Sequence, residues 1–147
     1  MSRTRIFAYG SNMHPNRMLG RVSGAVSLGR ARLPGYRLVL NKRGRDGSAK
    51  ANLSADAEGL VWGVVWELSV ASLATLDGHE SGYERVALSV HCEGAGGEVE
   101  AEAYLSARLA AAIPFDWYMD HLVRGARAHG LPEDYVAWLE SLPSRPG

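Results

Sequence analysis

The stretch Leu60–Leu68, with the sequence LVWGVVWEL, is the most apolar strand-like segment of this 147-residue chain. Its apolar side chains fall on both faces of an extended backbone: Trp62, Val64 and Trp66 on one, and Val61, Val65 and Leu68 mixed onto the other. A strand that is apolar on both faces is normally covered on both sides. The segment therefore predicts a sheet built outward from a buried central strand.

Other short stretches with strand patterns lie before and after it. They are Arg3–Ala8, Ala25–Leu33, Tyr36–Leu40 after a Pro34-Gly35 turn, and a hairpin of Tyr83–Cys92 with Glu98–Leu105. Residues 41–50 (NKRGRDGSAK) are polar, basic and punctuated by glycine, so we expect an exposed loop there.

Helical patterns are few and are concentrated toward the end of the chain. A short helix is expected at about Pro15–Leu19, and Ser69 caps a second one that carries Val70, Leu73 and Leu76. Phe115–His129 and Glu133–Leu142 have helical periodicity, separated by Gly130-Leu131-Pro132. Many short strands followed by a few helices predict an α+β fold, with a curved mixed β-sheet or a small barrel flanked by helices.

Composition narrows the class of protein. The length suits a single domain over residues 1–147, and 16 basic residues balance 16 acidic ones, so no overall field attracts nucleic acid or a membrane. No segment approaches the roughly 20 apolar residues of a membrane span, and no signal peptide is recognisable. The single Cys92 sits in an alternating apolar run and is expected to be a buried, inert thiol. We expect a soluble, cytoplasmic protein with no nucleic-acid or membrane partner.

A tight loop follows the first strand. Tyr9-Gly10-Ser11-Asn12 comes directly after the apolar run Ile6–Ala8. Gly10 lets a ligand approach the backbone closely or permits a positive φ, and successive N–H groups in such a turn form a concavity for an anion or a carbonyl oxygen. An ordinary strand-to-helix turn capped by Asn12 explains the same four residues, and the tetrapeptide alone does not separate the two.

A second motif, Leu76–Val86 (LDGHESGYERV), favours a functional interpretation of the loop, because of the family that the two motifs together resemble. With the Tyr-Gly-Ser-Asn loop, it resembles the γ-glutamylcyclotransferase and AIG2-like family, which pairs that loop with a later Leu-Asp-x-x-Glu segment followed by Gly, Tyr and Arg. The resemblance extends to Ala51–Leu53, Val61–Trp66 and Arg124–Pro132, and so spans nearly the whole chain. The last of these segments is most similar to the branch that includes γ-glutamylcyclotransferase itself. It implies a six-stranded barrel-like sheet flanked by helices.

The resemblance also implies a reaction and a site. The family converts a γ-glutamyl compound into 5-oxoproline and a free amine with one catalytic carboxylate, which falls on Glu80 here. Without the resemblance, the sequence would predict only a solvent-exposed glutamate in a turn at position 80. Tyr9, Gly10, Ser11, Asn12 and Tyr118 are the expected substrate-binding residues, and no metal or organic cofactor is expected. The expected partner is a small γ-glutamyl substrate.

Neighbouring residues receive secondary roles. Tyr104 is a further candidate for substrate contact, Asp77 is expected to cap or orient the turn, and Arg85 is expected to pair with a carboxylate. The five histidines show no metal-ligand spacing, and His79 is expected to be exposed. Ser81 separates Glu80 from Gly82, where many family members have Glu-Gly directly, and this insertion is expected to affect which leaving amine fits.

Alternative functions remain open at this stage. The same chemistry could act on a γ-glutamyl-lysine isopeptide or a γ-glutamylated metabolite. A non-catalytic small-ligand binder on the same scaffold is an alternative of another class. The retained Glu80 argues against it, and a Glu80 carboxyl turned away from the cavity would restore it. A nucleic-acid binder would rest on Arg43, Arg45 and Lys50 alone, which is one short loop on a neutral chain. The leaving amine, and whether the protein is a monomer or a homodimer, are not determined by the sequence.

Overall fold

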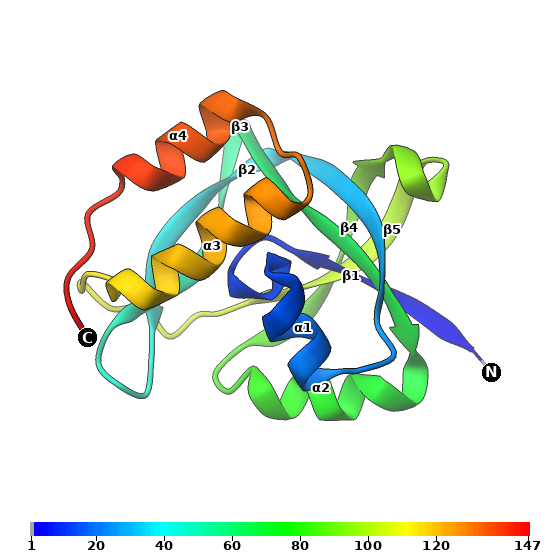
Figure 1. Ribbon diagram of the computed structural model, residues 1–147, viewed down its shortest axis with the longest axis horizontal. Helices are drawn as coiled ribbons and strands as arrows, with labels where there is room; N and C mark the ends of the chain where they lie inside the picture. The colour runs from blue at the N-terminus through cyan, green and yellow to red at the C-terminus, as the bar shows by residue number, and fades with distance from the viewer. Residues whose placement is uncertain (1) are drawn as a thin grey trace.

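Five strands close into a barrel in the computed structural model, which describes residues 2–147 (Figure 1). The strands are β1 (Arg3–Ala8), β2 (Val26–Arg43), β3 (Ala49–Ser69), β4 (Glu84–Cys92) and β5 (Gly97–Leu105). Their order around the barrel is β1-β3-β2-β4-β5. All neighbours are antiparallel except β1 and β5, which meet in parallel where Ile6 lies opposite Glu102. The predicted α+β class and the small barrel are confirmed.

β3 is the central strand that its sequence predicts. It pairs with β1 on one side, where Ile6 lies opposite Trp66, and with β2 on the other. Val61, Val64, Val65 and Leu68 have no exposed surface. Burial on both faces explains why this segment lacks the apolar–polar alternation of a half-exposed strand.

Two details of the strands differ from the sequence prediction. Residues 26–33 and 36–40 belong to one strand, β2, because pairing with β3 continues across the Pro34-Gly35 step with only a shift of register. This is one reason the barrel has five strands rather than the six implied by the resemblance. Residues 41–50 are not an exposed loop: β2 runs to Arg43, β3 starts at Ala49, and Lys42 and Ser48 are buried.

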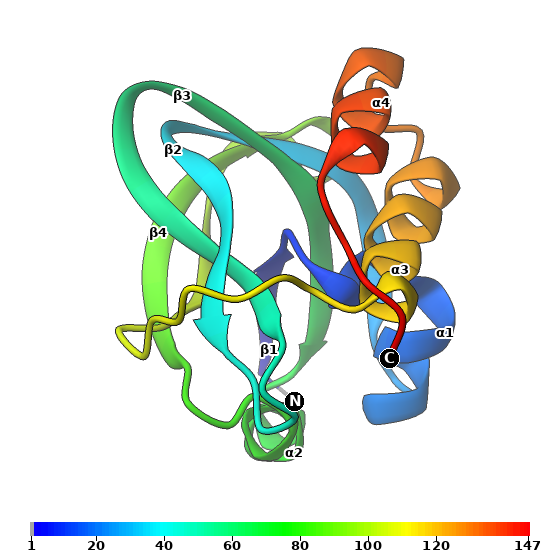
Figure 2. The same cartoon turned by 90° about the vertical axis from the view of Figure 1, so that its left-hand side faces the viewer.

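Helices cover one side and one end of the barrel (Figure 2). They are α1 (Pro15–Arg21), α2 (Leu73–His79), α3 (Asp116–Ala128) and α4 (Glu133–Ser141), with short 3-10 turns η1 (Ser11–Met13), η2 (Val70–Ser72) and η3 (Glu93–Ala95). Figure 2 shows α1, α3 and α4 on the same side, with α2 below the barrel. These elements match the predicted helices, and the Ser69 hydroxyl accepts a hydrogen bond from Ser72 N–H as the predicted cap requires.

The core fills the barrel and continues under α3. Tyr118, Leu122 and Ala126 recur every four residues along α3 and are all buried, so one stripe of the helix faces the barrel. Cys92 is fully buried, as expected. Among residues 2–147, no helix is both long enough and apolar enough to cross a membrane.

Candidate active site

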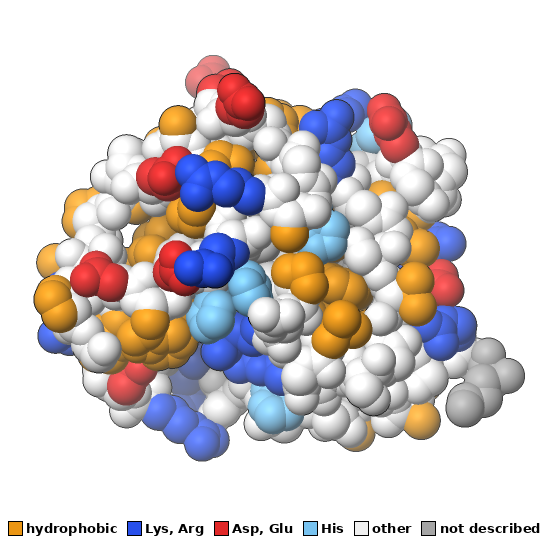
Figure 3. Space-filling model, viewed as in Figure 1, with side chains coloured by type: hydrophobic (Ala, Val, Ile, Leu, Met, Phe, Trp, Pro, Cys, Tyr) orange, Lys and Arg blue, Asp and Glu red, His pale blue; other side chains and the backbone are white. Residues whose placement is uncertain are grey.

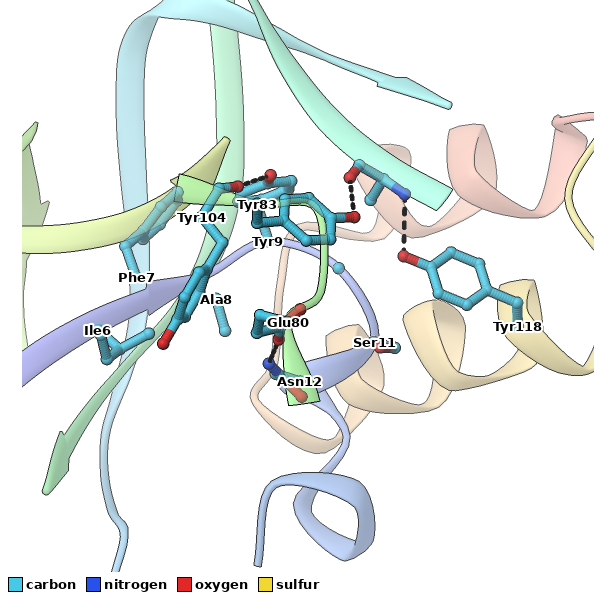
Figure 4. A pocket seen from close by; sticks show the side chains of 12 residues that line it. Ile6, Phe7, Ala8, Tyr9, Ser11, Asn12, Glu80, Tyr83, Tyr104 and Tyr118 are labelled. Atoms are coloured by element: carbon cyan, nitrogen blue, oxygen red, sulfur yellow. Dashed lines mark hydrogen bonds between the residues drawn. The ribbon is translucent and has the colours of Figure 1, made fainter. Parts of the chain in front are cut away.

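The first strand and the second helix end at a common cavity (Figure 4). β1 stops at Ala8 and the chain turns through Gly10 into η1, while α2 stops at His79 and Glu80 follows immediately. All six residues predicted for the site line this cavity: Tyr9, Gly10, Ser11, Asn12, Glu80 and Tyr118. The structure therefore brings together two motifs that are almost seventy residues apart in the sequence.

Glu80 is a largely desolvated carboxylate. Its side chain is 12% exposed, and its Oε1 accepts a hydrogen bond from the Asn12 amide and lies 3.4 Å from Arg21 Nη1. Burial raises the pKa of Glu80, and Arg21, the Asn12 hydrogen bond, Arg17 and Lys42 oppose that rise. A carboxylate with a raised pKa is a stronger base than one in water, which is the property that proton abstraction needs.

The Gly10–Asn12 loop is held by side chains on both sides of it. Trp66 Nε1 donates to the Asn12 carbonyl at 3.0 Å, Arg17 donates to Ser11 Oγ at 2.9 Å, and Arg21 donates to Asn12 Oδ1 at 2.9 Å. Because the Asn12 side chain binds Glu80 and Arg21, it does not cap the turn, and the ordinary-cap alternative is wrong. Within residues 2–147 no protein acceptor is found for the N–H groups of Gly10, Ser11 and Asn12.

Gly10 is required for close packing rather than for a left-handed backbone. Its φ is −116°, so the positive φ that glycine permits is not used. A Cβ at this position would lie 3.0 Å from Ala51 Cβ and 3.3 Å from the Tyr118 hydroxyl. A larger side chain at Gly10 would therefore occupy space inside the cavity.

Three tyrosines form one wall of the cavity and remain protonated. Tyr118 accepts from Ala51 N–H at 2.9 Å, Tyr83 donates to the Ala51 carbonyl at 2.6 Å, and Tyr9 donates to the Tyr104 carbonyl. Burial raises the pKa of Tyr118 to about 12 and raises the pKa values of Tyr9 and Tyr83 as well. Their hydroxyls can therefore donate and accept hydrogen bonds at neutral pH without carrying charge.

A polar network lies behind the Glu80 turn. Glu80 N–H donates to the Asp77 carbonyl at 3.0 Å, and the Asp77 carboxylate accepts from the Tyr104 hydroxyl at 2.6 Å and from Arg85 at 2.9 Å. Arg85 also donates to Glu102 at 2.8 Å. The predicted pairing of Arg85 with a carboxylate is confirmed, and Asp77 is positioned to orient the turn. The Tyr104 ring lines the cavity while its hydroxyl is engaged by Asp77.

Several residues at the site were not predicted from the sequence. Arg17 contacts the loop and Arg21 contacts Glu80, both from α1. Their spacing of four residues places them on one face of a helix that starts just after the loop, and the sequence could have predicted this placement. Tyr83 was visible only as part of the motif. Nothing in the sequence pointed to Lys42 as a site residue, because residues 41–50 were predicted to form an exposed loop.

A second, outer cavity of about 340 Å³ shares Ser11, Glu80, Tyr83 and Tyr118 with the cavity described above. Its wall includes five basic residues: Arg17, Arg21, Lys42, Arg45 and Lys50. In the lower left of Figure 3, Lys and Arg side chains gather over the region that lies between the β2–β3 turn and the end of α2 in Figure 1. His79 is exposed at this rim, and residues 2–147 contain no group of three or more metal-ligating side chains.

Comparisons with known proteins agree with this geometry. The model of the AIG2-like family matches residues 60–139. Mouse gamma-glutamylcyclotransferase is 30% identical over 146 residues, covering 92% of this chain and 77% of the mouse protein, and the human protein is 28% identical over 144 residues, covering 92% and 77%. A solved gamma-glutamyl cyclotransferase structure superposes with a TM-score of 0.91 at 27% identity, covering 98% of this chain and 90% of that one.

The closed barrel and these relatives define a class of small enzyme that acts on a small-molecule substrate. The chain belongs to the AIG2-like family, and it is an enzyme of the gamma-glutamylcyclotransferase kind.

Proposed function

We propose that this enzyme converts a γ-glutamyl amino acid or γ-glutamyl amine into 5-oxoproline and a free amine, with Glu80 acting first as general base and then as general acid. One observation supports this most directly: a desolvated carboxylate lines the same small cavity as a loop whose N–H groups have no acceptor within residues 2–147. The substrate carries both the nucleophile, its α-amine, and the electrophile, its γ-carbonyl carbon. The protein therefore needs to contribute only one carboxylate for proton transfer.

The first step removes a proton. The α-ammonium of a γ-glutamyl unit has an ordinary pKa of about 8. Glu80 takes one proton from it, and the nitrogen lone pair then forms a bond to the γ-carbonyl carbon. The π electrons of the carbonyl move to its oxygen, which becomes an oxyanion as the five-membered ring closes.

The second step returns the proton. The oxyanion re-forms the carbonyl, the bond between the γ-carbon and the departing nitrogen breaks, and protonated Glu80 gives its proton to that nitrogen. The ring nitrogen still carries a second extra proton, which Glu80 takes and passes to the departing amine. The lactam is therefore neutral, the amine leaves as an ammonium ion, Glu80 ends as a carboxylate, and no water is consumed. Such acid–base catalysis is typically worth about 10²–10⁴ in rate.

The Gly10–Asn12 loop is assigned to the oxyanion. Its N–H groups are fixed before the substrate arrives, because Trp66 and Arg17 hold the loop from either side. Preorganised donors of this kind are worth on the order of 10² or more each. The protonated Tyr118 hydroxyl borders the same space and is assigned to orient the substrate amine.

The test is Glu80→Gln, assayed for 5-oxoproline release from a panel of γ-glutamyl amino acids and amines. Glutamine keeps the size and the hydrogen-bonding capacity but cannot titrate, so kcat/KM should fall by about 10² or more while the melting curve shows a folded protein. The matched control is Glu84→Gln, an exposed glutamate on β4, which should behave as wild type. Activity of the Glu80→Gln variant within a few-fold of wild type would remove Glu80 from the mechanism.

Two further substrates test the intramolecular attack. A γ-glutamyl compound that lacks the α-amine has no nucleophile, so it should bind as a competitive inhibitor without turnover. An α-glutamyl dipeptide presents its amide on the wrong carbon and should be inert. A Glu80 carboxyl turned away from the cavity would have restored the non-catalytic binder alternative, whereas Glu80 lines the cavity.

A further inference from the structure

The outer cavity is far more basic than the rest of this neutral chain. Five cationic side chains line it, against two carboxylates, Glu80 and Asp46. Arg21 is the partner of Glu80, and Lys50 Nζ lies 3.2 Å from Asp46 Oδ2. Among the residues that the structure describes, Arg17, Lys42 and Arg45 have no carboxylate within salt-bridge distance.

Lys42 is the least expected of these cations. It is only 6% exposed, and its ammonium donates to the Ser81 carbonyl at 2.7 Å and lies 4.7 Å from the centre of the Tyr83 ring. Burial lowers the pKa of Lys42, and the charge of Glu80 opposes that change. Buried charges are normally paired, and a cation held without an anion beside an enzyme cavity is suited to pairing with a ligand.

Ser81 connects Lys42 to a second cation. The Ser81 carbonyl accepts from Lys42, and the Ser81 hydroxyl accepts from Arg45 at 3.0 Å. The residue inserted between Glu80 and Gly82 therefore anchors two positive groups at separate points on the rim of the cavity. Because Glu80 must reach the departing nitrogen to protonate it, the rim beside Glu80 is where the leaving amine would lie.

We propose that the preferred leaving amine is an acidic amino acid, joined to the γ-glutamyl unit through its α-nitrogen and held through its two carboxylates by Lys42 and Arg45. This inference rests on the proposed function and narrows its substrate class. Two separated cations match two separated carboxylates. A leaving amino acid with a cationic side chain, such as lysine, would enter a cavity that already has an excess of positive charge. Contacts between like charges are costly.

The experiment compares two nearly isosteric substrates, γ-glutamyl-glutamate and γ-glutamyl-glutamine, by kcat/KM for 5-oxoproline release at low ionic strength. The expected ratio is about tenfold in favour of glutamate, and it should shrink as salt is raised to about 0.5 M, because ions screen the charges at the rim. γ-Glutamyl-lysine, linked through the α-nitrogen, should be the poorest of the three.

Two variants locate the effect. Arg45→Gln changes an exposed side chain and should fold normally, and Lys42→Met keeps the buried apolar stem while removing the charge. Each should lower the glutamate-to-glutamine ratio at least threefold. Arg124→Gln is the matched control, because it removes one positive charge from the exposed face of α3, far along the chain from the rim, and should leave the ratio unchanged.

The outcomes separate this inference from the proposed function. A wild-type ratio near or below one, with clear turnover of γ-glutamyl compounds, overturns the acidic leaving group and leaves the cyclisation intact. A tenfold ratio that neither rim variant reduces also overturns it, because the selectivity would then come from elsewhere. Absence of 5-oxoproline from every γ-glutamyl compound would refute the proposed function itself, and the inference with it.

Discussion

Gly125 is the point at which α3 crosses the loop that carries the site, and Gly125→Ala tests how tightly the two are packed. A Cβ at Gly125 would lie 2.5 Å from His14 N and Met13 C, and 2.6 Å from Met13 Cβ. Ordinary contacts of this kind begin near 3.4 Å, so the helix and the loop would have to separate by about 1 Å. Two of the three contacts are with backbone atoms, which cannot rotate aside.

The expected loss of stability follows from two opposing effects. Overpacking a tight contact typically costs about 1–3 kcal/mol, and the backbone neighbours place this case toward the upper end. Alanine in place of glycine inside a helix returns about 1 kcal/mol. The net destabilisation is about 1–2 kcal/mol, which for a domain of this size lowers Tm by roughly 3–8 °C.

Activity should fall as well. Tyr118 lies seven residues before Gly125 on the same face of α3, and its hydroxyl is 2.9 Å from Ala51 N. A shift of about 1 Å breaks that hydrogen bond and moves the hydroxyl within the cavity, and misplacements of this size can cost up to about 10² in rate. We expect kcat/KM to drop at least tenfold.

Thermal and urea unfolding measure the stability effect, and 5-oxoproline release measures the activity. Gly20→Ala is the matched control, since Gly20 is in α1 and a Cβ there would meet nothing within 4 Å. That variant should be as stable as wild type or up to about 1 kcal/mol more stable. If Gly125→Ala melts at or above the wild-type temperature, the tight packing of α3 on the loop is not what positions the site.

Two other predictions concern the loop and the pH dependence. Gly10→Val should damage kcat/KM more than Ser11→Ala, because valine enters the space between Ala51 and Tyr118 whereas Ser11→Ala leaves the N–H donors in place; equal losses in steady-state kinetics would contradict this. The acidic limb of the kcat/KM profile should lie above the ordinary glutamate pKa, because burial raises the pKa of Glu80. The same shift means that the folded state binds more protons than the unfolded state between the two pKa values, so wild-type stability falls as pH rises through the folded pKa. Glu80→Gln should therefore gain stability relative to wild type at pH 8 and lose that advantage at pH 4, and an advantage that is the same at both pH values would argue against a desolvated carboxylate.

The elements that depend on local pattern were predictable. Leu60–Leu68 is central because apolar residues on both faces require cover on both faces, and α3 forms because its apolar residues recur at helical spacing. The turn predicted at Pro34-Gly35 was wrong for a physical reason. Pro34 still pairs with Leu60 and Tyr36 pairs with Ala55, so β3 absorbs the irregularity as a shift of register and the strand continues.

The candidate site was predictable in part. The contact between Asn12 and Glu80 joins two turns that no local pattern relates, and only the resemblance to a family paired them. The four-residue spacing of Arg17 and Arg21 is visible in the sequence. It predicts a role at the site only once the loop beside α1 is known to line that site. The burial of Lys42 could not be foreseen, because it depends on the β2–β3 hairpin folding back over the end of α2, which is a tertiary contact between polar segments.

Closure of the barrel accounts for how the two halves of the site stay in register without a substrate. β1 meets β5 in parallel, so the loop after β1 lies beside the end of β5. There the Tyr9 hydroxyl donates to the Tyr104 carbonyl, and the Tyr104 hydroxyl donates to Asp77, whose own carbonyl accepts the N–H of Glu80. This chain of hydrogen bonds links the Gly10–Asn12 loop to Glu80 through the end of β5 rather than through a ligand. Because the groups are fixed before binding, little reorganisation is required during the reaction, and a single carboxylate with backbone donors is sufficient for the proposed cyclisation.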